Sequence, residues 1–173
     1  MKVVVVNGVC GSGKDSFESY VAAYAKLNGY IIDKTSMVTY VKKCAEKCGW
    51  AGGKTNADRK FLASLKDILE EWNDSPFEDV HKFLLTAAKD GKYLTFVDAR
   101  EGKDIDRIKE HWPDTTTVLV KNDNVRPPQG NHADENVNDY FYDWVIDNSS
   151  SLEDLRLAAE VWFEKILEEG ELV

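Results

Sequence analysis

Residues 3–14 read Val3-Val4-Val5-Val6-Asn7-Gly8-Val9-Cys10-Gly11-Ser12-Gly13-Lys14, and this stretch decides the fold of the 173-residue chain. Its first part is a continuous β-branched run, which is typical of a strand buried on both faces of a parallel sheet. Its second part is rich in glycine. From Asp15 to Leu27 the apolar residues then recur at spacings of three and four, as in an amphipathic helix. The chain therefore opens with a strand, a glycine loop and a helix.

The rest of the sequence alternates short strands with helices. The patterns predict strands at 30–32, 93–97, 115–120 and 142–146, and helices at 35–48, 56–72, 75–90, 105–111 and about 150–167. Two helix starts have the spacing of a capping box, Ser75 to Glu78 with Pro76 at the first helical position, and Ser150 to Glu153. This alternation predicts an α/β sandwich around a mostly parallel sheet, in a single domain over residues 1–173.

The composition excludes several classes of partner. The chain has 31 acidic and 22 basic residues, a net charge of −9, and no contiguous basic run. A protein that binds the phosphate backbone normally carries a basic stripe, so we expect no bulk nucleic acid partner. No segment approaches the ~20 apolar residues that a bilayer requires, and the N-terminus lacks a cleavage-site pattern, so we expect neither secretion nor a membrane partner.

The cysteines indicate a reducing compartment. There are three of them, Cys10, Cys44 and Cys48, and a chain of this size does not need disulfides to be stable. We therefore expect reduced thiols and a cytoplasmic location. The sequence leaves the oligomeric state open, with a homodimer among the alternatives.

The glycine loop matches the pattern of a phosphate-binding loop, in which two glycines separated by four residues precede Lys14. Small residues between a strand and a helix let successive backbone N–H groups point at a phosphate, and the helix N-terminus adds a favourable field. The alternative is a glycine-rich turn without a ligand. The pattern predicts ATP binding by Gly8, Gly11, Ser12, Gly13, Lys14, Asp15 and Ser16.

The residue after Lys14 departs from the usual pattern. Asp15 stands where a Ser or Thr hydroxyl normally binds Mg²⁺, and Ser16 follows it. A carboxylate is also a hard oxygen ligand for this ion. Asp15 therefore either binds the metal, directly or through water, or favours the helix N-terminus by its charge.

In these features the sequence resembles the deoxynucleoside monophosphate kinase group of small phosphate-loop kinases. The resemblance rests on Ser12-Gly13-Lys14-Asp15, on Asp98-Ala99-Arg100-Glu101 after a middle strand, and on the late loop His132-Ala133-Asp134-Glu135-Asn136-Val137. It covers essentially the whole chain in the order of elements. It implies the P-loop NTPase fold, a five-stranded sheet in the order 2-3-1-4-5, and phosphoryl transfer from Mg-ATP to a nucleoside or deoxynucleoside monophosphate. A kinase for another small metabolite, or a non-catalytic nucleotide-binding regulatory protein, is the alternative.

Two residues follow the third predicted strand, where the phosphate loop also emerges, because the carboxyl ends of parallel strands lie together. Asp98 is expected to hold Mg²⁺ or its waters together with Asp15, unless it only caps the next turn. Arg100 is expected to contact the acceptor phosphate, because a guanidinium binds phosphate through two hydrogen bonds. A surface ion pair with Glu101 or Asp104 is its alternative role.

The polar segment from about Asn122 to Asn138 is longer than a routine connection, which predicts a functional loop or lid. Arg126 lies in it and is expected to close over the transferred phosphoryl group, unless the acidic residues of the loop hold it. Arg59, near the start of the helix at 56–72, is a second candidate for the acceptor phosphate. A solvated ion pair is its alternative role.

Other candidates follow from position alone. Asp33 is expected to end the second strand, where it would contact the acceptor, act as a base or form a plain turn. Asn148 follows the fifth strand, where the resemblance implies a place beside the adenine, and helix capping is its alternative role. Trp50 is a candidate for stacking on a base. The remaining tryptophans are expected in the core, namely Trp72, Trp112, Trp144 and Trp162.

Overall fold

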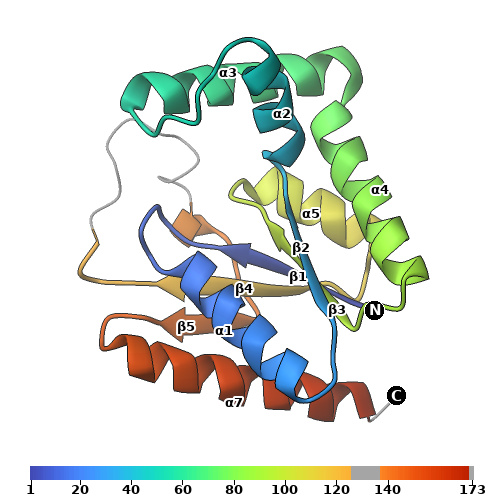
Figure 1. Cartoon of the computed structure of the whole chain (residues 1–173), viewed down its shortest axis with the longest axis vertical. Helices are drawn as coiled ribbons and strands as arrows, with labels where there is room; N and C mark the ends of the chain where they lie inside the picture. Colours follow the sequence, from blue (N-terminus) through green and yellow to red (C-terminus); the bar gives the residue numbers. More distant parts are fainter. Residues whose placement is uncertain (126–136, 172–173) are drawn as a thin grey trace.

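The computed structural model describes residues 1–125 and 137–171 and contains a parallel five-stranded sheet between two layers of helices (Figure 1). The strands are β1 (Lys2–Asn7), β2 (Ile32–Ser36), β3 (Leu94–Asp98), β4 (Thr116–Lys121) and β5 (Trp144–Asp147). They lie in the order β2-β3-β1-β4-β5, and every neighbouring pair is parallel. The predicted fold class and strand order are confirmed.

The helices divide between the two faces of the sheet. Helices α1 (Lys14–Leu27) and α7 (Leu152–Glu171) cover one face, and α4 (Ser75–Lys89) and α5 (Gly102–His111) cover the other (Figure 1). Helices α2 (Thr39–Lys47) and α3 (Asn56–Asn73) form an outer pair that packs against α4. Among the described helices, none has the length and apolar character needed to cross a membrane.

Strand β1 is buried on both faces, as its β-branched run predicts. Val4 and Val6 pack under α1 and α7, whereas Val3 and Val5 pack under α4 and α5. Because side chains alternate along a strand, the single run supplies the middle of both hydrophobic layers. The central position of β1 therefore follows directly from its sequence.

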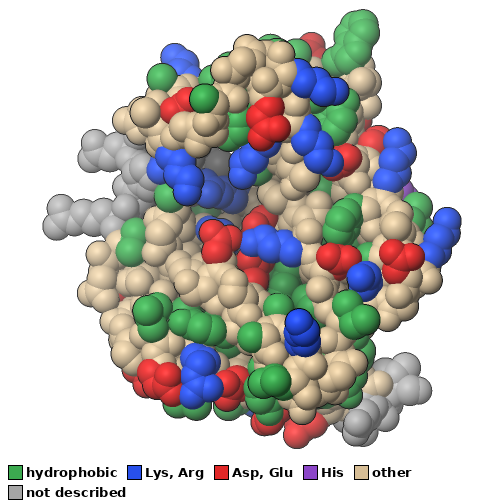
Figure 2. All heavy atoms as spheres, in the orientation of Figure 1, with side chains coloured by type: hydrophobic (Ala, Val, Ile, Leu, Met, Phe, Trp, Pro, Cys, Tyr) green, Lys and Arg blue, Asp and Glu red, His purple; other side chains and the backbone are tan. Residues whose placement is uncertain are grey.

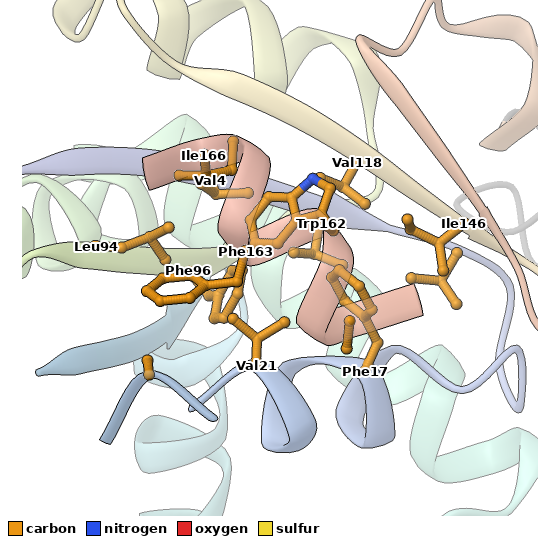
Figure 3. Close-up of a cluster of buried hydrophobic side chains, with 14 of the residues drawn as sticks. Val4, Phe17, Val21, Leu94, Phe96, Val118, Ile146, Trp162, Phe163 and Ile166 are labelled. Atoms are coloured by element: carbon orange, nitrogen blue, oxygen red, sulfur yellow. The ribbon is translucent and has the colours of Figure 1, made fainter. Parts of the chain in front are cut away.

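The layer beneath α1 and α7 is rich in aromatic side chains (Figure 3). Phe17 of α1 meets Trp162 of α7 edge to face, with ring centroids 5.4 Å apart. Phe163 packs edge to face against Tyr24 and Tyr30. Since α1 begins at Lys14, these contacts also hold the end of the glycine loop in place.

Several boundaries differ from the sequence prediction. Strand β2 begins at Ile32 and continues to Ser36, whose pairing partner is Asp98, so the helix expected from residue 35 begins only at Thr39. Pairing with β3 overrides the helical spacing of these residues. The prediction that Asp33 ends this strand is wrong, because Asp33 pairs with Thr95 near the amino end of β2.

Both predicted capping boxes need correction. Helix α4 does begin at Ser75, but its cap residue is Asp74 in a left-handed conformation, with φ of 57°, and the Asp74 carboxylate binds Arg107. At α7 the box is one residue later than predicted. Ser151 Oγ donates to Asp154 Oδ2 over 2.7 Å and accepts from the Asp154 backbone N–H. Neighbouring serines and acidic residues can form a capping box with the same spacing at more than one position. Tertiary contacts decide which position forms it.

The expected core assignment of the tryptophans holds only in part. Trp162 is buried and Trp112 and Trp144 are half-buried, but Trp72 is 80% exposed. The core assignment of Trp72 is therefore wrong, because this end of α3 faces solvent.

We expect Phe163→Ala to lower the free energy of unfolding by about 3–5 kcal/mol, because it removes a fully buried ring that touches three tyrosine rings. Urea unfolding followed by circular dichroism measures the change. The control on the same helix is Leu157→Ala, since Leu157 is partly exposed and should change stability by less than about 1 kcal/mol. Equal losses in the two variants would contradict the described core.

Candidate functional site

The glycine loop between β1 and α1 has a backbone that only glycine adopts easily. Gly8 and Gly13 have φ angles of 150° and 100°. A Cβ atom on Gly8 would lie 2.4 Å from the Val120 carbonyl oxygen, and one on Gly13 would lie 2.2 Å from Asn148 Nδ2. The loop is thus pressed against the ends of β4 and β5, in the shape expected of a phosphate cradle.

Lys14 and Ser12 both turn toward this loop. The Lys14 ammonium donates to the Gly8 carbonyl oxygen over 2.6 Å, so the charge lies against the loop itself. Ser12 Oγ is buried and has no hydrogen-bond partner among the described residues. A cradle with a cation at one side and an unused buried hydroxyl fits an anionic ligand such as a nucleotide phosphate.

Asn7 connects the loop to its surroundings. Its Oδ1 accepts from the Gly8 backbone N–H over 2.7 Å, and its Nδ2 donates to the Arg100 carbonyl oxygen and to Tyr142 Oη. The Tyr142 hydroxyl in turn donates to the Val137 carbonyl oxygen. Sequence analysis missed Asn7, although a polar residue that ends an otherwise apolar, fully buried strand was a usable signal.

A group of three carboxylates lies beside the loop. The ligand oxygens of Asp15, Glu18 and Asp98 all lie within 4.8 Å of one another, so the structure does bring Asp15 and Asp98 together. The Lys34 ammonium lies among them, 2.9 Å from Asp15 Oδ1 and 3.1 Å from Asp98 Oδ2, and it also binds Glu18. Sequence analysis missed Glu18 and Lys34. The signal for Glu18 was an acid on the apolar side of α1, one turn after Lys14.

The charges in this carboxylate cluster strongly perturb one another. Glu18 is only 3% exposed, and burial together with the neighbouring Asp98 carboxylate raises its pKa to about 8. The hydrogen bond from Lys34 lowers the pKa of Asp15. Burial alone would lower the pKa of Lys34, but its hydrogen bonds to Glu18 and Asp15 outweigh that effect and raise it. A single ammonium therefore serves three carboxyl groups.

The carboxylate cluster also has unused acceptors. Glu18 Oε1 and Asp98 Oδ1 are buried and make no hydrogen bond within the described parts of the chain. Hard carboxylate oxygens are the ligands that Mg²⁺ prefers. Asp15, Glu18 and Asp98 therefore fit a divalent cation, with Lys34 supplying the positive charge in the present arrangement.

Arg59 reaches the glycine loop from the outer helix α3. Its Nη2 lies 3.4 Å from Cys10 Sγ, and its Nε donates to the Lys54 carbonyl oxygen. Figure 2 shows Lys and Arg side chains gathered around a hollow below α2 and α3, despite the net charge of −9. The local field at the site is thus set by these cations rather than by the whole chain.

Arg100 lies two residues after the end of β3 and is half-buried. Its backbone carbonyl is held by Asn7. Glu101 and Asp104, which the sequence offers as its ion-pair partners, both bind Lys66, over 2.8 and 3.1 Å. Arg100 therefore lies at the edge of the sheet where the glycine loop and the carboxylate cluster meet.

Asn148 lies against the glycine loop. Its Nδ2 donates to the Ser12 carbonyl oxygen over 2.9 Å, and its backbone N–H donates to the Lys121 carbonyl. It does not cap α7, which begins after Ser151. Asn148 thus supports the shape of the loop.

The remaining candidates are placed less directly. Ser16 is half-buried in the first turn of α1. Asp33 forms an ion pair with Lys92, and it lies near the end of β2 opposite to the glycine loop, so the structure does not bring it to this site. Trp50 donates through Nε1 to Asp58 Oδ1. Arg126 and most of the predicted lid at 122–138 lie outside the described residues.

Comparison with known proteins identifies the fold. Neither a scan against models of protein families nor a search of curated proteins finds a match. Among solved structures, the chain is similar to an unliganded sugar kinase from Janibacter sp. HTCC2649, with 17% identity and a TM-score of 0.54 over 95% of each chain. The chain shares its fold with this sugar kinase.

Two further solved structures resemble the chain. The protein APE1195 has 14% identity and a TM-score of 0.51 over 95% of both chains. A cysteine-to-alanine mutant of the APS kinase CysC from Mycobacterium tuberculosis has 14% identity and a TM-score of 0.46 over 95% of this chain and 96% of that chain. At such identities the likeness concerns the fold.

We expect Glu18→Gln to change how stability depends on pH. In the wild type, the pKa of Glu18 is about 8 in the folded state and near 4.5 in the unfolded chain, so the folded state binds more protons between these values. The free energy of unfolding should therefore fall as pH rises through this window, by up to roughly 1.4 kcal/mol per pH unit, and Glu18→Gln should remove that contribution.

Urea titrations from pH 5 to pH 8 in EDTA measure the difference between the two profiles. Glu78→Gln on α4 is the control, because Glu78 is exposed and should leave the wild-type slope unchanged. Parallel profiles for the wild type and Glu18→Gln would contradict the assignment.

Proposed function

We propose that this chain transfers a phosphoryl group from Mg-ATP to a nucleoside monophosphate or deoxynucleoside monophosphate. The observation that carries the proposal is the meeting of three parts at one edge of the sheet: the glycine loop, the carboxylate cluster, and Arg59 from α3. A sugar kinase with the same fold supports the general reaction class. The resemblance of Ser12-Gly13-Lys14-Asp15 and Asp98-Ala99-Arg100 to the deoxynucleoside monophosphate kinase group supports the acceptor class.

The glycine loop and Lys14 would bind the phosphates of ATP. Backbone N–H groups at the start of α1 and the Lys14 ammonium both favour negative charge there. Asn148, which contacts the Ser12 carbonyl, keeps the far side of the loop in shape. In phosphoryl transfer the protein mostly positions the reactants and neutralises charge, and this loop would do both.

Asp15, Glu18 and Asp98 would hold Mg²⁺. The ion would neutralise charge on the phosphate oxygens, the part of the chemistry that the protein side chains supply least well. Lys34 keeps the three carboxylates close together and limits their mutual repulsion. Because the Lys34 ammonium lies among the three carboxylates, it would have to move away or share these carboxylates with the ion when Mg²⁺ binds.

Arg59 and Arg100 would bind the phosphate of the acceptor. Arg59 reaches the glycine loop from the outer helix α3, and Arg100 lies in the turn after β3, where its carbonyl oxygen accepts from Asn7. Guanidinium groups bind phosphate through paired hydrogen bonds, which suits an acceptor that itself carries a phosphate. Arg126 stays the predicted third cation, on the lid.

A kinase for a different small metabolite is the second candidate, and the likeness to a sugar kinase favours it. A phosphate loop of this shape serves many acceptors, so fold alone does not choose between them. The acceptor distinguishes the two candidates, because only the first requires a phosphate on the accepting molecule.

The deciding experiment measures ADP release from Mg-ATP across all common ribo- and deoxyribonucleoside monophosphates, with nucleosides, simple sugars and no acceptor as further arms. We expect stimulation by one or a few monophosphates. Stimulation only by a sugar or another unphosphorylated acceptor would move the assignment to the second candidate. ATP binding without turnover in every arm would contradict both and indicate a non-catalytic nucleotide-binding protein.

Lys14→Ala should abolish this turnover while the thermal unfolding midpoint stays close to that of the wild type, because Lys14 is only half-buried and lies against the loop rather than in the core. Lys26→Ala is the matched control on the same helix, since Lys26 is exposed in its last turn. Unchanged turnover in Lys14→Ala would rule out the glycine loop as the ATP site.

Arg59→Ala should raise the KM for the acceptor by about ten- to a hundredfold and change the KM for ATP much less. A hydrogen bond to a charged group contributes about 1.5–3 kcal/mol, which corresponds to this range. Arg156→Ala is the control, because Arg156 forms surface ion pairs with Glu153 and Glu160 on α7. An acceptor KM that does not change would remove Arg59 from the acceptor site.

A further inference from the structure

The outer face of α3 carries an apolar stripe that faces solvent. The stripe consists of Phe61, Leu65, Ile68 and Trp72, at spacings of four, three and four residues that place all of them along one side of the helix. Phe61 is 40% exposed, Ile68 61% and Trp72 80%. Leu65 between them is half-buried, whereas the other three side chains stay exposed within residues 1–125 and 137–171.

The opposite side of α3 combines ion pairs with the half-buried side chains of Leu62 and Leu69. Lys66 is buried there and binds Glu101 and Asp104 at the start of α5. Figure 1 shows α3 at one end of the molecule, with α2 and α4 on its inner side. Phe61, Ile68 and Trp72 are thus apolar side chains of α3 that the described part of the chain leaves exposed.

Two exposed charges flank the stripe on the same side, at opposite ends. Lys60 and Glu71 are eleven residues apart, which is about three turns of helix. Neither has an opposite charge three or four residues away along α3. No ion pair of either residue occurs among the described parts of the chain. This leaves a positive and a negative group, each available to a partner.

We propose that the stripe binds the same stripe of a second copy of this chain, with the two α3 helices antiparallel about a two-fold axis. In this arrangement Phe61 faces Trp72 of the partner subunit and Leu65 faces Ile68 of the partner subunit. Lys60 then lies on the same flank as Glu71 of the partner subunit, and the contact occurs twice. A parallel pairing would instead place the two copies of each charge on opposite flanks, so it would form neither ion pair.

The size of the stripe sets the strength of the expected dimer. Four apolar side chains from each copy and two ion pairs in all correspond to an interface at the small end of the range for specific complexes. We therefore expect a reversible dimer with a Kd on the order of micromolar. This inference does not depend on the proposed function, because it uses no residue of the phosphate loop or the carboxylate cluster.

The test is sedimentation equilibrium of the whole chain from 1 to 200 µM. We expect a monomer–dimer equilibrium in the wild type, and a monomer throughout for Ile68→Glu and for Trp72→Gln. Trp72 is so exposed that its replacement should not affect folding, which circular dichroism verifies. Val161→Glu is the control, because Val161 is similarly exposed but lies on α7, and this variant should keep the wild-type Kd. A monomeric wild type, or a dimer that survives Ile68→Glu and Trp72→Gln, would overturn the proposal.

Charge reversal tests the antiparallel arrangement. Lys60→Glu alone and Glu71→Lys alone should each raise the Kd at low salt by about three- to tenfold, because each brings like charges together twice. The double variant with both changes should return the Kd to the wild-type value, since opposite charges again meet. A double variant as weak as the single variants would rule out the antiparallel pairing.

Discussion

The burial of β1 on both faces is the constraint on which the rest of the molecule depends. Because its valines lie in both hydrophobic layers, this strand occupies the middle of the sheet, and the loop that follows it emerges at the centre of one edge. Asn7 then ends the strand and ties the loop to the turn after β3. The ring contact of Phe17 with Trp162 holds the helix on the other side of the loop. A phosphate cradle needs such support, since its glycines have little preference of their own.

Beside the glycine loop, the structure holds three acidic side chains close together, which is an electrostatically unfavourable arrangement. Asp15, Glu18 and Asp98 come from two different elements and would repel one another if Lys34 of β2 did not lie among them. Asp15 is exposed, but Glu18 is buried and Asp98 is half-buried, and burying an acid without enough partners is costly. Unused acceptor oxygens on Glu18 and Asp98 make this cluster the part of the described chain that we propose for Mg²⁺.

Helix α3 serves the molecule from two sides. Its inner side carries the buried Lys66 and the guanidinium of Arg59 that reaches the glycine loop, whereas its outer side is apolar and exposed. Ion pairs of the buried Lys66 contribute to the attachment of the inner side, together with the half-buried Leu62 and Leu69. Pairing of the outer sides would hold the helix that carries Arg59 more firmly. An oligomeric contact and a substrate contact would then share one rigid element.

The sequence by itself determined the class of fold, the order of elements, the glycine loop and the meeting of Asp15 with Asp98. These follow from local spacing and from the rule that parallel strands end at a common edge. Only the tertiary structure decided that Glu18 and Lys34 join those acids, that Asp33 lies inside β2, that Ser151 rather than Ser150 caps α7, and that Trp72 is exposed. Each of these depends on which distant segment packs against a residue. The periodicity of a helix or strand in the sequence does not identify that segment.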